Sequence, residues 1–280
     1  MSTAEVLSST RRATELLERF KPLIGIRPAA LSLALLRVFG PDQRRSIISA
    51  TNGLRIYADP FTHLGREILT RGSFESETEE VFRRHLKTDG VFLDIGANEG
   101  YFSALAGTLV GPGGFVASIE PQSRLRDIIE INLRINNVSR YRVYTNAFGG
   151  EDGAEGQINL WPTHNTGASS IVRHYRFNRR AEKFTFISLD RIFTECKIDH
   201  LDLVKVDVEG YEGQVVRYLA PHLRAKRIGL LFLDYHREIL DRTGIDRRAI
   251  HQEILQCGYN LVSGDATKLE SYHLYALSVS

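Results

Sequence analysis

The chain has 280 residues, of which 42% are hydrophobic, and its 36 basic residues nearly balance 34 acidic ones. This composition suffices for a sizeable core and excludes a whole-protein field that would attract nucleic acid or an anionic membrane. Two isolated cysteines, Cys196 and Cys257, predict neither a disulfide framework nor a structural zinc site, so we expect a cytoplasmic protein. The most apolar stretch, Ala29 to Phe39, is shorter than the ~20 residues of a membrane span.

The first part of the chain predicts a helical lead. Leu16, Leu17 and Phe20 recur at helical spacing, and prolines punctuate residues 1–50, which we expect to be helical. A short alternating strand, Leu54 to Ala58, should follow, and then a helix near Ser76 whose Ser76-x-x-Glu79 matches a capping box. We therefore expect residues 1–75 to form a lead or cap and residues 76–280 to form one catalytic domain.

From residue 91 onward, short apolar runs alternate with longer helical stretches, which is typical of βαβ units around a parallel sheet. The fold class that we predict is a Rossmann-like α/β domain. Strands are expected at 91–95, 115–120, 141–146, 202–207, 228–235 and 272–279, and helices at 99–109, 123–136, 211–221 and 246–257. Between Gly149 and Leu189 no long helical period occurs, so an insertion above the sheet is expected at about 150–188.

A glycine-rich turn joins the first of these strands to its helix. Such a turn permits close approach of a ligand and leaves helix-start N–H groups free. Asn98 stands where a dinucleotide fingerprint requires its second glycine, and the acidic Asp94 precedes the turn. A pyrophosphate would be repelled there, whereas a ligand with an ammonium and a sulfonium would be attracted. The predicted cofactor-binding residues of this segment are Asp94, Gly96, Ala97, Asn98, Gly100 and Tyr101.

Two further strand ends complete the predicted cofactor site. Glu120, followed by Pro121, ends the second strand and should accept hydrogen bonds from ribose hydroxyls. Asn146 and Ala147 end the third strand, where an adenine ring would be expected, although the adjacent Phe148 could equally be ordinary core. Together these signals predict a nucleoside cofactor, S-adenosylmethionine.

Three charges alternate along a strand that should be central and buried. Lys205, Asp207 and Glu209 would project to one side at its carboxyl end. Buried charges are costly unless they are paired or used, so the alternatives are a structural lysine–carboxylate network and a functional cluster. For Asp207 we favour a functional role, both beside the cofactor and in catalysis.

At this point the chain resembles the FkbM family of methyltransferases over about residues 52–235. The resemblance rests on Asp94-Ile95-Gly96-Ala97-Asn98-Glu99-Gly100, Glu120-Pro121, Asn146-Ala147, Ser188-Leu189-Asp190 and Lys205-Val206-Asp207-Val208-Glu209-Gly210-Tyr211-Glu212. It implies a class I methyltransferase fold with a mostly parallel seven-stranded sheet, and methyl transfer from S-adenosylmethionine, usually to a hydroxyl of a sugar or natural product. Glu99 departs from the family pattern and adds a charge near the methionine end of the cofactor.

Catalysis should depend mainly on alignment, with a general base for a neutral hydroxyl. Asp207 and His236 are the candidate bases, and Lys205 and Glu209 are included in the catalytic set. Alternatively, Asp207, Asp234 and His236 could hold Mg²⁺, which is possible but not favoured.

The insertion carries aromatic and basic side chains that suggest an acceptor lid. Its predicted substrate residues are Trp161, His164, Arg173 and Tyr175, and its further basic residues could favour an anionic acceptor. The expected partner is therefore a small molecule or glycan; a homodimer is possible, and nucleic acid is not favoured. The competing functions are an NAD(P)-dependent oxidoreductase, an RNA-directed methyltransferase and a non-catalytic scaffold.

Overall fold

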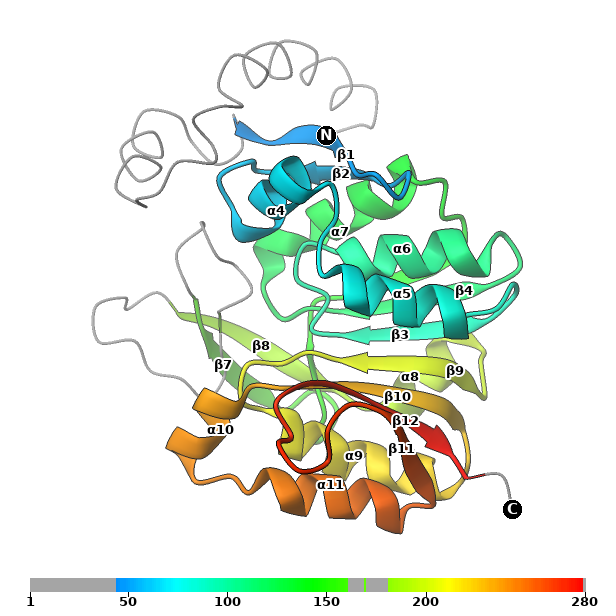
Figure 1. Ribbon diagram of the computed structural model, residues 1–280, viewed down its shortest axis with the longest axis vertical. Coiled ribbons are helices and arrows are strands. Elements are labelled where there is room, and N and C mark those ends of the chain that lie inside the picture. Colours follow the sequence, from blue (N-terminus) through cyan, green and yellow to red (C-terminus); the bar gives the residue numbers. More distant parts are fainter. Residues whose placement is uncertain (1–43, 161–168, 170–180, 279–280) are drawn as a thin grey trace.

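The computed structural model describes residues 44–160, 169 and 181–278 (Figure 1). Its centre is a seven-stranded sheet in the order β11-β12-β10-β9-β3-β4-β5. Neighbouring strands from β10 to β5 are parallel, and β12 is antiparallel to both of its neighbours. The predicted Rossmann-like, mostly parallel seven-stranded α/β fold is thus confirmed. The strands are β3 (Val91–Ile95), β4 (Phe115–Ile119), β5 (Tyr141–Tyr144), β9 (Leu201–Val206), β10 (Ile228–Tyr235), β11 (Tyr259–Ser263) and β12 (Ser271–Leu277).

Helices cover both faces of the sheet (Figure 1). On one face lie α5 (Ser76–His85), α6 (Tyr101–Val110) and α7 (Ser123–Ile135), whose apolar side chains join one buried cluster. On the other face, α8 (Leu189–Cys196), α9 (Glu212–Arg224) and α11 (Arg247–Gln256) contribute to a second cluster. The central strands are buried on both faces, as expected for a parallel sheet, so side chains can reach a ligand only at the strand ends.

The lead differs from its sequence-based expectation. Residues 1–43 lie outside the described part, but the predicted helix up to residue 50 is wrong, because β1 (Ser46–Ser49) pairs antiparallel with β2 (Arg55–Ala58). The helical spacing that motivated the prediction lies upstream of this hairpin, which carries the β-branched pair Ile47 and Ile48. A short helix, α4 (His63–Arg71), follows, and its N-terminus is capped by the Thr62 side chain.

The capping box predicted at Ser76 is also wrong. The helix α5 begins at Ser76 itself, so Ser76 is already inside the helix rather than at its N-cap. The N-cap is Glu75, which lies in the left-handed region at φ 48° and makes no side-chain cap hydrogen bond.

The predicted insertion contains β7 (Glu155–Asn159) and β8 (Ala181–Ile187), which form a small three-stranded sheet together with β6 (Ala147–Phe148) just before it. In Figure 1 this sheet lies on the side to which the arrowheads of β3 and β9 point, as does α10 (Arg237–Thr243). The insertion therefore stands beside the carboxyl ends of the parallel strands, where ligands bind in open α/β sheets. Among the helices of the described ranges, none has the length and apolar character needed to cross a membrane.

Candidate active site

The turn after β3 packs directly against the end of β9. Gly96 has φ +85°, and a Cβ there would lie 1.9 Å from the backbone oxygen of Asp207. Gly100 has φ +80°, and its Cβ would meet Ile129 of α7 at 3.1 Å. Both positions therefore require glycine, because the backbone there is left-handed and other protein atoms lie too close for a side chain. The sequence did not reveal this packing, because a glycine-rich turn accommodates a ligand or a neighbouring segment equally well.

Glu120 is held at the end of β4 by three N–H groups. Its Oε2 accepts from the Asn98 N–H at 2.9 Å, and its Oε1 accepts from the Gln122 backbone and side-chain N–H groups, both at 3.0 Å. Burial raises the pKa of Glu120 above its ordinary value, although these hydrogen bonds act in the opposite direction. The carboxylate, with about four acceptor positions in all, keeps capacity for a ligand hydroxyl. This arrangement fits the ribose end of S-adenosylmethionine.

Glu120 lines a cavity of about 80 Å³, which we call the Glu120 cavity. Its other lining residues include Asn98, Pro121 and Ser169. Ser169 belongs to the insertion, and its hydroxyl donates to Gln122 Oε1 at 3.1 Å. The insertion thus reaches the residue that holds Glu120.

Asp94 lies beneath this site. Its side chain is 0% exposed, accepts from the Ser103 hydroxyl at 2.6 Å, and lies 3.6 Å from Lys205 Nζ. Within the described part of the chain, Asp94 lines neither the Glu120 cavity nor the strand-end cavity described below. The cation beside Asp94 is therefore Lys205, because the Asp94 side chain is buried between Ser103 of α6 and Lys205 of β9.

Lys205 links two carboxylates under the cleft. Its Nζ donates to Asp207 Oδ2 at 2.9 Å, and its side chain is only 3% exposed. Burial opposes the charged form of Lys205, but Asp207 and Asp94 outweigh it and raise the pKa of Lys205. Burial alone would raise the pKa of Asp207, yet the charges of Lys205 and His236 hold it below its ordinary value. Asp207 is thus a carboxylate at neutral pH.

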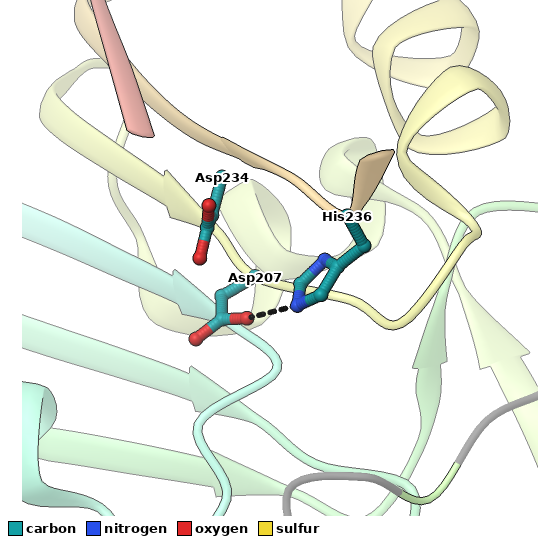
Figure 2. Close-up of side chains that lie close together, drawn as sticks. All are labelled: Asp207, Asp234 and His236. Carbon is teal, nitrogen blue, oxygen red and sulfur yellow. Dashed lines mark ion pairs between the residues drawn. The ribbon is translucent and has the colours of Figure 1, made fainter. Parts of the chain in front are cut away.

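His236 follows β10 and points toward Asp207, as Figure 2 shows. Its Nε2 lies 3.6 Å from Asp207 Oδ1 and 3.7 Å from Glu209 Oε1, while its Nδ1 lies 2.7 Å from Glu212 Oε1. Burial opposes the charged form of His236, but the hydrogen bond to Glu212 and the neighbouring carboxylates raise its pKa to about 10. The sequence did not single out Glu212, although it ends the quoted family motif.

Asp207, Asp234 and His236 can each direct one ligand atom to a common point, since these atoms lie within 4.8 Å of one another (Figure 2). Burial and the charge of Asp207 raise the pKa of Asp234 to about 6. The three side chains predicted as a metal set from the sequence are therefore brought together.

These groups line a cavity of about 210 Å³ at the strand ends, which we call the strand-end cavity. It shares Gly96, Asn98, Asp207 and Glu209 with the Glu120 cavity, so the two form one cleft. The lead supplies further lining residues that the sequence did not predict: Thr62, His63, Leu64, Phe74 and Glu75. The sequence carried no signal for these residues, because they reach the strand ends only through the packing of α4 on β1 and of α5 on α6.

Glu99 and the predicted residue Tyr101 both contact segments that precede β3. Glu99 is 0% exposed and pairs with Arg45 at 2.6 Å, which compensates the charge that departs from the family pattern. The Tyr101 hydroxyl donates to Glu79 and accepts from Asn52 Nδ2 at 2.9 Å. Ala97, Glu99 and Tyr101 all line the strand-end cavity.

The third predicted strand end has a different environment. Asn146 Nδ2 donates to the backbone and side-chain oxygens of Thr185, and Ala147 pairs with Phe186. Neither residue is among the described residues that line the cleft. The four predicted substrate residues, Trp161, His164, Arg173 and Tyr175, lie outside the described residues.

Some solved structures are similar to this chain at low sequence identity. An O-methyltransferase from Bacillus cereus in complex with SAH is 13% identical and covers 74% of this chain and 83% of its own, with a TM-score of 0.44. An rRNA methylase from Streptococcus thermophilus is 8% identical and covers 72% and 95%, with a TM-score of 0.38. At such identities, the substrates in these names belong to those proteins alone.

No curated protein matches this chain in sequence. The family model described as the methyltransferase FkbM domain matches residues 94–261, which include the turn after β3, Glu120, Lys205, Asp207 and His236. The chain therefore belongs to the FkbM family of methyltransferases.

Proposed function

We propose that this methyltransferase transfers the methyl group of S-adenosylmethionine to a hydroxyl oxygen of a sugar, glycan or natural product. The observation that carries the proposal is that Glu120, which can hold a ribose, and the charged ends of β9 and β10 line one continuous cleft. Family membership favours methyl transfer over the hydride transfer of an oxidoreductase. The free thiols of Cys196 and Cys257 suit a reducing compartment such as the cytoplasm.

When bound, S-adenosylmethionine supplies an electrophilic methyl group, and alignment of the acceptor oxygen with it is the main requirement. Glu120 would hold the ribose, and the turn from Gly96 to Gly100 would contact the methionine end. The Asp207 carboxylate, held by Lys205, lines both parts of the cleft. It is therefore placed to orient an acceptor hydroxyl, and His236, once it has lost its own proton, is placed to accept the proton of that hydroxyl.

A neutral, polyhydroxylated acceptor suits the described lining better than an anionic one. Apart from Glu99, whose charge is compensated by Arg45, four carboxyl groups surround the strand-end cavity, those of Glu75, Asp207, Glu209 and Asp234. A phosphate or carboxylate there would face like charges, whereas hydroxyl groups can donate hydrogen bonds to these oxygens.

A divalent cation is the second candidate for activating the hydroxyl, since Asp207, Asp234 and His236 have suitable spacing. Two charges weigh against it: Lys205 already neutralises Asp207, and an imidazolium at His236 has no free lone pair for a metal. Turnover after treatment with EDTA, with and without added Mg²⁺, separates the two mechanisms.

The experiment has two stages. Calorimetry should show binding of S-adenosylmethionine and not of NAD(P)H, and transfer of a tritiated methyl group should then be screened over neutral sugars, anionic sugars and RNA. Asp207→Asn should abolish turnover while leaving cofactor binding measurable. The matched control is Asp190→Asn, which removes the same charge from a side chain that is 76% exposed on α8. Normal turnover of Asp207→Asn, or labelling of RNA alone, would contradict the proposal.

A further inference from the structure

The buried carboxylate of Glu212 on α9 contacts the imidazole of His236. Glu212 is 0% exposed, and its Oε1 lies 2.7 Å from Nδ1 of His236. The same oxygen accepts from the backbone N–H of His236 and that of Gly210, both at 3.3 Å. The other carboxylate oxygen, Oε2, has no hydrogen-bond partner among the described residues. Glu212 therefore fixes both the backbone and the ring of His236.

This contact determines which ring nitrogen faces the cleft. A carboxylate accepts but cannot donate, so Nδ1 must carry a proton whenever it bonds to Glu212. In a neutral His236 the lone pair is then on Nε2, which lies 3.6 Å from Asp207 Oδ1, beyond hydrogen-bond distance. His236 lines the strand-end cavity, and Glu212 does not line it.

We propose that Glu212 is a positioning residue that holds His236 with Nε2 toward the acceptor hydroxyl and stabilises the imidazolium formed when Nε2 takes the proton. This inference rests on the proposed O-methylation. In that step the acceptor oxygen forms a bond to the methyl carbon, the carbon–sulfur bond breaks with its electron pair left on sulfur, and the hydroxyl proton moves to Nε2. The arrangement follows the logic of a carboxylate-oriented histidine base.

The surrounding charges predict how the histidine titrates. The hydrogen bond to Glu212 is the largest of the contributions that raise the pKa of His236 to about 10 against the effect of burial. His236 must lose a proton before it can act as a base, so turnover should rise with pH. The charged or titratable groups around it are Lys205, Asp207 and Glu209 on and after β9, Glu212 on α9, and Asp234 on β10.

The first test needs no acceptor. Histidine-labelled full-length protein would be titrated by NMR, with His236→Gln identifying the His236 signal. In the wild type, His236 should stay doubly protonated up to about pH 8.5, and Glu212→Gln should lower its pKa by at least about one unit. The matched control is Glu238→Gln, which removes the same charge from an 85% exposed side chain on α10 and should leave the His236 signal unchanged.

The second test uses the neutral-sugar acceptor found by the methyl-transfer screen. Glu212→Gln should shift the rise of kcat to lower pH and reduce its plateau by about 10²-fold, with S-adenosylmethionine affinity unchanged. The inference is overturned if Glu212→Gln leaves the His236 signal unchanged, or if it leaves both the plateau and the pH profile of kcat unaltered. If the titrations agree but no hydroxyl compound is methylated, the proposed function fails while the coupling of Glu212 to His236 stands.

Discussion

Arg45 and Glu99 form a buried ion pair that connects the start of the β1–β2 hairpin to the turn after β3. Arg45→Met would leave the Glu99 carboxylate buried beside an apolar side chain. The pair has an N–O distance of 2.6 Å and side-chain exposures of 7% and 0%. Two charges about 4 Å apart at an effective dielectric constant of about 20 interact by roughly 4 kcal/mol. Removal of one partner of a buried pair typically costs about 3–5 kcal/mol, which is the loss of unfolding free energy that we expect.

Urea unfolding followed by circular dichroism measures this loss. Arg45→Met with Glu99→Leu should recover most of it, because replacing a whole buried pair by apolar groups is often nearly neutral. Arg84→Met is the matched control: its ion pair with Glu80 has the same 2.6 Å distance but exposures of 68% and 71%. The control should lose less than about 1 kcal/mol. A similarly small loss in Arg45→Met, or a double variant no more stable than the single one, would refute the reasoning.

Three further changes test other parts of the site. Glu120→Ala should weaken S-adenosylmethionine binding by roughly 10- to 150-fold in calorimetry, because hydrogen bonds to a charged group are worth about 1.5–3 kcal/mol; unchanged affinity would remove Glu120 from the cofactor site. Gly96→Ala should lower the melting temperature far more than Gly153→Ala, since both have positive φ but only Gly96 would meet the Asp207 carbonyl, and equal losses would contradict this. Asp234→Asn should be more stable than the wild type at pH 8 and equal to it near pH 4. A carboxyl with its pKa raised to about 6 contributes stability below its unfolded value of 3.8 and loses it as pH rises through 6, so a pH-independent difference would disprove the assignment.

The sheet and the part of the cleft formed by the strand ends could be predicted from the sequence because their signals are local. Buried parallel strands give apolar runs with polar residues directly after them, so Glu120, Asp207 and His236 were found at strand ends, which the structure brings to one cleft. Asp94 shows the limit of such reasoning. Its position before the turn indicated a nearby cation, but only the packing of β3 against β9 reveals that this cation is Lys205.

The roles of the lead and of Glu212 could not be predicted, since both depend on contacts between distant segments. Thr62 and Phe74 resemble ordinary capping and core residues until α4 is packed on β1 and α5 on α6. Glu212 lies 24 residues before His236, and no spacing rule connects them. Ser76 failed as a cap because the backbone of Glu75 turns into the left-handed region one residue earlier than the capping motif assumes.

The contact between Gly96 and the Asp207 carbonyl has a consequence for how new specificities could arise in this fold. Because no side chain separates the turn after β3 from the end of β9, these two segments form one rigid frame that tolerates little variation. Sequence changes that alter specificity are then expected in the segments that line the cleft around this frame, which are α4, Phe74–Glu75 and the insertion that carries Ser169. A designer who wished to retarget the enzyme would accordingly exchange these peripheral segments and leave the strand ends untouched.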